Sequence, residues 1–185
     1  LEFRRVLFRS MGGREMYAYL GTLPFVDAEN LGVTGHSMGT WSSWSVASSF
    51  PNHKAIVLQC GELFPKSYYD SEAIDFHNVL LLQARYDEFV CFLDYTKAVP
   101  DELVNTELRY GEFANQSGPI DWNTTYGSFA DGTARRMELL TNANHRLVTI
   151  NKHAIATAMD WFFDSFGETA PIDSGNQTAL LLETM

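Results

Sequence analysis

The stretch Leu31-Gly32-Val33-Thr34-Gly35-His36-Ser37-Met38-Gly39 carries the clearest structural signal in the chain. Its first four residues predict a short buried strand, and its last five match the pattern G-x-S-x-G. Glycines on both sides of a serine allow the backbone to turn sharply and neighbouring backbone to approach without a Cβ clash. A helix of small residues is predicted next, over residues 40–50, and ends at Pro51. The pattern therefore favours a serine presented on a tight turn between strand and helix.

Apolar runs on the C-terminal side of this motif predict the rest of a sheet. The runs Ala55–Cys60 and Val79–Ala84 are continuous rather than alternating, which is typical of parallel strands covered on both faces. A last strand is predicted from Arg135 through Leu140 and onward, followed by an amphipathic helix over Ala154–Phe166. This alternation of strands and helices predicts an α/β fold, with a mostly parallel sheet and helices on both faces.

Two other regions give weaker signals. A helix is predicted over Glu15–Leu23, and residues 88–133 are rich in turn-forming residues around one predicted helix, Cys91–Val99. Trp41 and Trp44 have helical spacing, so we expect both to pack on the sheet.

The composition excludes several classes of protein. The chain has 185 residues, of which 45% are hydrophobic and 19% charged, as expected for one globular domain. Its formal net charge of −10 argues against a nucleic-acid partner, which needs a basic face. The two cysteines form no disulfide framework, and no apolar run reaches the roughly 20 residues of a membrane span. No residues have metal-ligand or phosphate-loop spacing, so the sequence predicts no metal and no cofactor.

The two ends differ in character from the centre. Residues 1–10, Leu-Glu-Phe-Arg-Arg-Val-Leu-Phe-Arg-Ser, lack the continuous apolar segment of a signal peptide and match the translation of a common sequencing-library adapter. We therefore expect them to be an artefact. We expect the folded domain to span residues 11–167, and residues 168–185, with their Pro, Gly and polar residues, to be a linker or tail.

The stretch from Val26 to Gly39, with Asp27 before the strand and the motif, resembles the α/β-hydrolase superfamily, and the resemblance extends over roughly residues 14–167. It implies that the chain is the C-terminal half of such a hydrolase and that strands on its N-terminal side are missing. It also implies that Ser37 is the nucleophile, with an acid after a later strand and a histidine after the last strand.

The resemblance identifies the acid and the base by their places in this order. Asp87 directly follows the second apolar strand after the motif, and Glu88 beside it is the alternative acid. His145 lies between the last strand and the last helix, and we favour it as the base over His153, which we expect to be exposed near the start of that helix. The position of His36 varies within the superfamily.

Two other histidines, His53 and His77, lie in a helix–strand connection and in an excursion from the sheet. We expect both at the surface.

These residues predict acyl transfer to water. Ser37 would attack a carboxylic ester, His145 would move the proton, and Asp87 would orient the imidazole. The Met38 N–H would be one oxyanion donor, and the resemblance places the second in an upstream loop. The substrate-binding residues are not identified, although the segment Tyr126–Arg136 lies between acid and base and is a candidate pocket wall.

The resemblance leaves alternatives open. The order of elements is similar to both dienelactone-hydrolase-like esterases and prolyl-oligopeptidase-like peptidases, so the partner is a small ester or a peptide. A non-catalytic binding domain that kept the fold is the remaining alternative. Residues 126–185 also resemble prokaryotic hydrolases in which membrane helices follow the catalytic domain, which implies a membrane segment beyond the C-terminus and a prokaryotic, membrane-associated protein.

Overall fold

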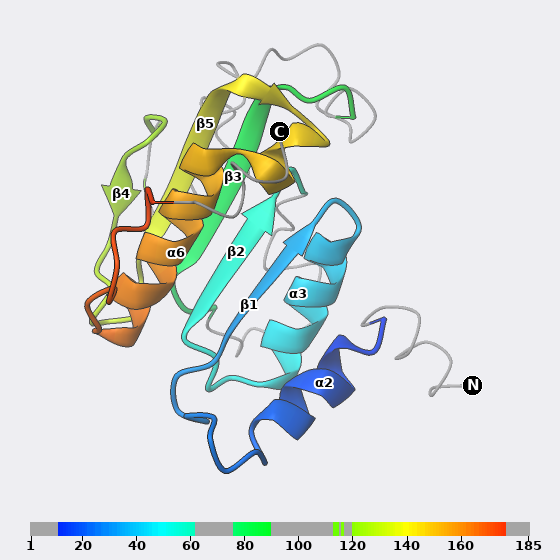
Figure 1. The fold of residues 1–185 in the computed structure, drawn as a ribbon, viewed down its shortest axis with the longest axis vertical. Coiled ribbons are helices and arrows are strands. Elements are labelled where there is room, and N and C mark those ends of the chain that lie inside the picture. The colour runs from blue at the N-terminus through cyan, green and yellow to red at the C-terminus, as the bar shows by residue number, and fades with distance from the viewer. Residues whose placement is uncertain (1–10, 62–75, 90–112, 115, 117–119, 177–185) are drawn as a thin grey trace.

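The computed structural model describes residues 11–61, 76–89, 113–114, 116 and 120–176, which form one sheet with helices on both faces (Figure 1). The strands, in the spatial order β1-β2-β3-β5-β4, are β1 (Gly32–His36), β2 (Ala55–Gln59), β3 (Val79–Tyr86), β4 (Thr125–Tyr126) and β5 (Arg135–Asn144). The helices are α2 (Gly13–Leu20), α3 (Gly39–Ser49), the 3-10 helix η3 (Leu147–Ile150) and α6 (Lys152–Phe166). Strands β1, β2, β3 and β5 are parallel, and β4 pairs antiparallel with β5. The predicted α/β class and mostly parallel sheet are confirmed.

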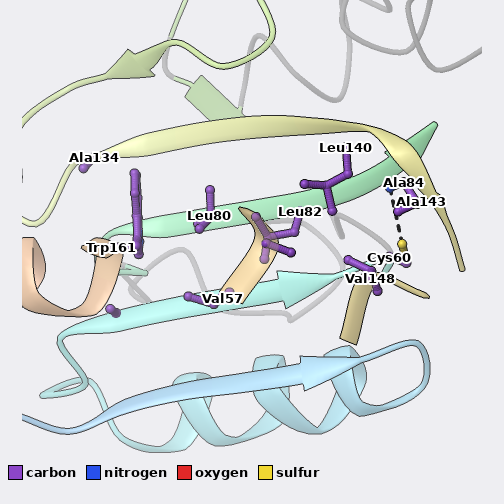
Figure 2. Packing of buried hydrophobic residues seen from close by; sticks show 12 residues of the cluster. Val57, Cys60, Leu80, Leu82, Ala84, Ala134, Leu140, Ala143, Val148 and Trp161 are labelled. Carbon is purple, nitrogen blue, oxygen red and sulfur yellow. Dashed lines mark hydrogen bonds between the residues drawn. The ribbon is translucent and has the colours of Figure 1, made fainter. Parts of the chain in front are cut away.

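Both faces of the sheet are packed because successive side chains of a strand point in opposite directions. On one face, Ile56 of β2 belongs to a buried cluster with Trp44 of α3. On the other face, Val57 of β2 and Leu80 of β3 lie in a second cluster with Trp161 of α6 (Figure 2). The central strands therefore need apolar residues at every position, which explains their continuous runs. In the described part of the chain, no helix has both the length and the hydrophobicity needed to cross a membrane.

The structure corrects two expectations from the sequence and adds one strand. Trp44 is buried as predicted, but Trp41 is 42% exposed, because the first turn of α3 lies beyond the end of β1. His53 is not at the surface but fully buried, with Nδ1 donating to the Phe50 carbonyl at 2.7 Å and Nε2 accepting from the His77 N–H at 3.0 Å. Strand β4 was not predicted, since two residues show no periodicity. The helix predicted over residues 91–99 lies outside the described residues.

Asn78, which precedes β3, joins several segments and yields a first prediction. Its buried amide donates to the carbonyls of Lys54 and Phe129 and accepts the Ala134 N–H, and its backbone is left-handed at φ 42°. Asn78→Ala removes the donor to the two carbonyls, leaves the buried Ala134 N–H without its acceptor and places alanine in a strained conformation, so we expect the free energy of unfolding to fall by about 3 kcal/mol or more.

Urea unfolding would measure this loss. The exposed Asn176→Ala serves as the matched control, and equal stability of the two variants would contradict the role of Asn78.

Candidate active site

Ser37 occupies a strained turn between β1 and α3. Its φ of 56° is left-handed, which is uncommon for a residue other than glycine. A Cβ on Gly35 would collide with the Gly39 carbonyl and lie 2.7 Å from Ser43 Oγ, whereas a Cβ on Gly39 would meet nothing within 4 Å. Of the two glycines in the motif, only Gly35 is therefore required by close packing, and the turn depends on it.

This difference provides a matched pair of variants. We expect Gly35→Ala to lower the free energy of unfolding by about 1–3 kcal/mol or more, because the backbone of the turn must move to make room. We expect Gly39→Ala to stay within about 0.5 kcal/mol of the wild type, since the site has space and alanine is a good helix former. Urea unfolding of both variants checks this, and equal losses would contradict the packing argument.

Asp87 lies at the carboxyl end of β3 and accepts several hydrogen bonds. Its side chain is only 3% exposed. Oδ2 accepts from Gln83 Nε2 at 3.0 Å, and Oδ1 accepts from the Phe89 N–H at 3.0 Å. Gln83 is the one polar side chain in the buried run Val79–Ala84 of β3, and this is the signal by which it could have been found. Because both oxygens are engaged, the carboxylate is fixed in orientation.

His145 lies directly after β5 and contacts Asp87 through its ring. Nδ1 and Asp87 Oδ1 are 2.9 Å apart, and His145 is buried. Since a carboxylate only accepts hydrogen bonds, Nδ1 carries the proton and Nε2 is left free to accept one. The ring of His36 lies 4.7 Å from that of His145, and the ring of Phe89 lies 4.5 Å from it, measured between centroids.

Ser37 lies at the same edge of the sheet as these two residues, and its neighbour His36 contacts the backbone of one of them. The parallel strands β1, β3 and β5 end at the same edge of the sheet (Figure 1), so the residues that follow them gather there. His36 Nε2 also lies 2.7 Å from the His145 carbonyl oxygen, which joins the end of β1 to the end of β5. The three residues selected from the sequence therefore lie at one edge, each after the predicted strand.

The two alternative residues have other partners. Glu88 contacts the backbone of His145, whose N–H donates to Oε2 at 3.3 Å, while the ring bonds to Asp87. The side chain of His153 is 62% exposed, as expected, and its Nε2 lies 2.5 Å from Oε1 of the buried Glu138. Arg136 binds the other oxygen of Glu138, so His153 belongs to a separate charged cluster.

Cys60, at the end of β2, is a member of the site that the sequence did not reveal. Its Sγ accepts the Ala84 N–H at 3.4 Å (Figure 2), and donor atoms of Cys60, Asp87 and His145 lie within 4.8 Å of one another. Three such groups can bind a metal ion, and the sequence spacing did not predict that they form a cluster. However, burial and then the charge of Asp87 raise the pKa of the Cys60 thiol, which disfavours the thiolate that a metal needs. The set fits a hydrogen-bonded thiol beside a carboxylate better than a metal centre.

Two further predicted features can be placed. Met38 caps α3, and within the described residues its N–H donates no hydrogen bond, as is typical of the first turn of a helix. The segment Tyr126–Arg136, expected as a candidate pocket wall, instead lies at the start of β5. The ten-residue strand separates it from His145 by about 30 Å, so it is not part of this site.

Comparison of the sequence with models of known protein families and with curated proteins gave no match. The assignment of a function therefore rests on Ser37, Asp87 and His145 and on the groups that surround them.

Proposed function

We propose that the chain is a serine hydrolase that transfers the acyl group of a carboxylic ester to water. The observation that carries the proposal is the buried pair of Asp87 and His145, joined at 2.9 Å, at the same sheet edge as a serine with left-handed backbone. A plain glycine-rich turn needs neither the serine nor the pair. The chain order Ser, Asp, His at the ends of parallel strands also supports our proposal that the sheet is the C-terminal part of an α/β-hydrolase fold.

The mechanism follows from the groups in place. Ser37 Oγ attacks the ester carbonyl while His145 Nε2 takes its proton, and His145 then returns the proton to the leaving alcohol. Asp87 holds the Nδ1–H tautomer and stabilises the imidazolium that forms. The Met38 N–H donates one hydrogen bond to the oxyanion. Water then attacks the acyl-enzyme with His145 as base, which releases the acid and restores Ser37.

The surroundings favour an ester with apolar groups. Six of the eleven exposed large hydrophobic side chains in the described part of the chain lie within five residues of Ser37, Asp87 or His145. They are Met38, Trp41, Tyr86, Phe89, Leu147 and Ile150. Exposed apolar side chains on the segments that carry the three residues support a binding site for an apolar ligand.

Labelling with a fluorophosphonate probe tests the proposal. We expect the wild type and Ser49→Ala, a variant at an exposed serine of α3, to bind one equivalent of the probe, and Ser37→Ala to bind none. Absence of labelling in the wild type, or labelling that survives Ser37→Ala, would contradict a Ser37 nucleophile and would favour a binding domain.

The same protein, tested on p-nitrophenyl esters of increasing acyl length and on aminoacyl amides, separates esterase from peptidase. We expect esters to be cleaved and kcat/KM to rise from acetate to longer acyl groups. Faster cleavage of the amides would identify a peptidase instead.

A further inference from the structure

We propose that His36 and Glu88 are positioning residues that hold the backbone of His145, one at its carbonyl and the other at its N–H. This inference rests on the proposed function, in which His145 is the base. His36 precedes Ser37 and Glu88 follows Asp87, so each of the two backbone bonds ties His145 to the neighbour of another member of the triad.

His145 needs such support because the sheet no longer provides it. The register of β3 and β5 ends at the pair Tyr86 and Asn144, after an irregularity between Ala84 and Tyr86. The next residue is therefore outside the ladder, and its peptide groups must find partners elsewhere. The 3-10 helix η3 begins only at Leu147.

At the carbonyl, the partner is the ring of His36. Nε2 lies 2.7 Å from the His145 oxygen, and because a carbonyl only accepts, Nε2 is the protonated nitrogen of His36. The two rings also lie 4.7 Å apart. Strands β1 and β5 are not neighbours in the sheet, because β2 and β3 lie between them. This bond therefore links the turn that holds Ser37 directly to the proposed base.

At the N–H, the partner is the carboxylate of Glu88. The distance from the His145 nitrogen to Oε2 is 3.3 Å, while Nδ1 of the same residue bonds to Asp87. The ring and the backbone of His145 are thus held by two consecutive acidic residues with separate tasks. The sequence alone suggested Glu88 as a substitute acid. In the structure its carboxylate instead accepts the backbone N–H of His145.

Three independent bonds on one residue have a chemical consequence. General base catalysis needs Nε2 within about 3 Å of the serine oxygen, and a displacement of about 1 Å can cost about 10²-fold in rate. Loss of either backbone bond leaves the Asp87 contact and the other backbone bond in place, but the main chain of His145 is then held less firmly. The rate of acyl transfer therefore falls, while substrate binding, which depends on other groups, does not.

Two pairs of variants separate the hydrogen bonds from the bulk of the side chains. His36→Phe keeps an aromatic ring beside His145 but has no donor, whereas His36→Gln keeps an N–H donor. Glu88→Leu removes the acceptor, whereas Glu88→Gln keeps an amide oxygen that can accept the His145 N–H. Each variant is made in the full chain and measured for kcat and KM on a p-nitrophenyl ester, for the rate of fluorophosphonate labelling, and for thermal unfolding.

We expect His36→Phe and Glu88→Leu to lower kcat and the labelling rate by about 10–10²-fold, with KM within about twofold of the wild type. We expect His36→Gln and Glu88→Gln to keep most of the wild-type kcat and labelling rate. Equal losses within each pair, losses that follow the unfolding temperature, or wild-type kcat in His36→Phe and Glu88→Leu would overturn the positioning role. An unlabelled and inactive wild type would instead overturn the proposed function, and this inference with it.

Discussion

His145→Ala is expected to lower kcat for ester hydrolysis by about 10⁶-fold, the loss typical of removing the base from a serine hydrolase triad. Without the imidazole, Ser37 must lose its proton to water, and a serine hydroxyl is a weak nucleophile at neutral pH. The ring is the group held by Asp87 at 2.9 Å, and no other histidine in the described part of the chain contacts that carboxylate. Single-turnover and steady-state assays on a p-nitrophenyl ester measure the effect.

His153→Ala is the matched control for this prediction. His153, at the start of α6, is largely exposed and pairs with Glu138. We therefore expect the kcat of His153→Ala to stay within about twofold of the wild type. If His153→Ala were the inactive variant and His145→Ala retained turnover, the assignment of the base would be wrong.

Asp87→Asn is expected to lower kcat by about 10⁴-fold, the loss known for this change in a serine protease. The site explains why an amide cannot replace the carboxylate. Oδ1 already accepts the Phe89 N–H and Oδ2 accepts Gln83 Nε2, so the NH₂ of asparagine faces a donor in either orientation. When that NH₂ faces His145, Nδ1 must become an acceptor, and the proton moves to the nitrogen that should act as base.

Two variants control for this effect. Asp160→Asn, at an exposed position of α6, should have no effect on kcat, and circular dichroism checks that Asp87→Asn keeps the fold. If Glu88→Gln gave the 10⁴-fold loss and Asp87→Asn did not, the role of the acid would belong to Glu88.

Order along the chain was enough to predict much of the candidate site. Ser37, Asp87 and His145 each follow a predicted strand, and parallel strands bring their carboxyl ends to one edge whatever the details of packing. The strands themselves were predictable because burial on both faces requires continuous apolar runs.

The partners of these residues could not be predicted in the same way. Whether Gln83 points toward Asp87, or Cys60 toward His145, depends on strand register and on local irregularity, which the pattern of residue types does not encode. The burial of His53 depends on two backbone partners, the Phe50 carbonyl and the His77 N–H, and the second of these is 24 positions away in the sequence. The misplaced segment Tyr126–Arg136 shows the same limit, because being between two residues in sequence does not mean being near them in space.

The parallel order of the sheet also determines when the proposed activity would first become possible during folding. Neighbouring parallel strands are joined by long crossovers, so the entropy of closing large loops must be overcome before the contacts form, and such chains fold slowly. The turn around Ser37 is local, but His145, the proposed base, lies 109 positions after His36 in the sequence. If the proposed function holds, a nascent chain carries Ser37 and Asp87 without activity until β5 docks on β3 and brings in His145. The rate at which ester hydrolysis returns after dilution from urea should accordingly report the rate at which β5 docks on β3.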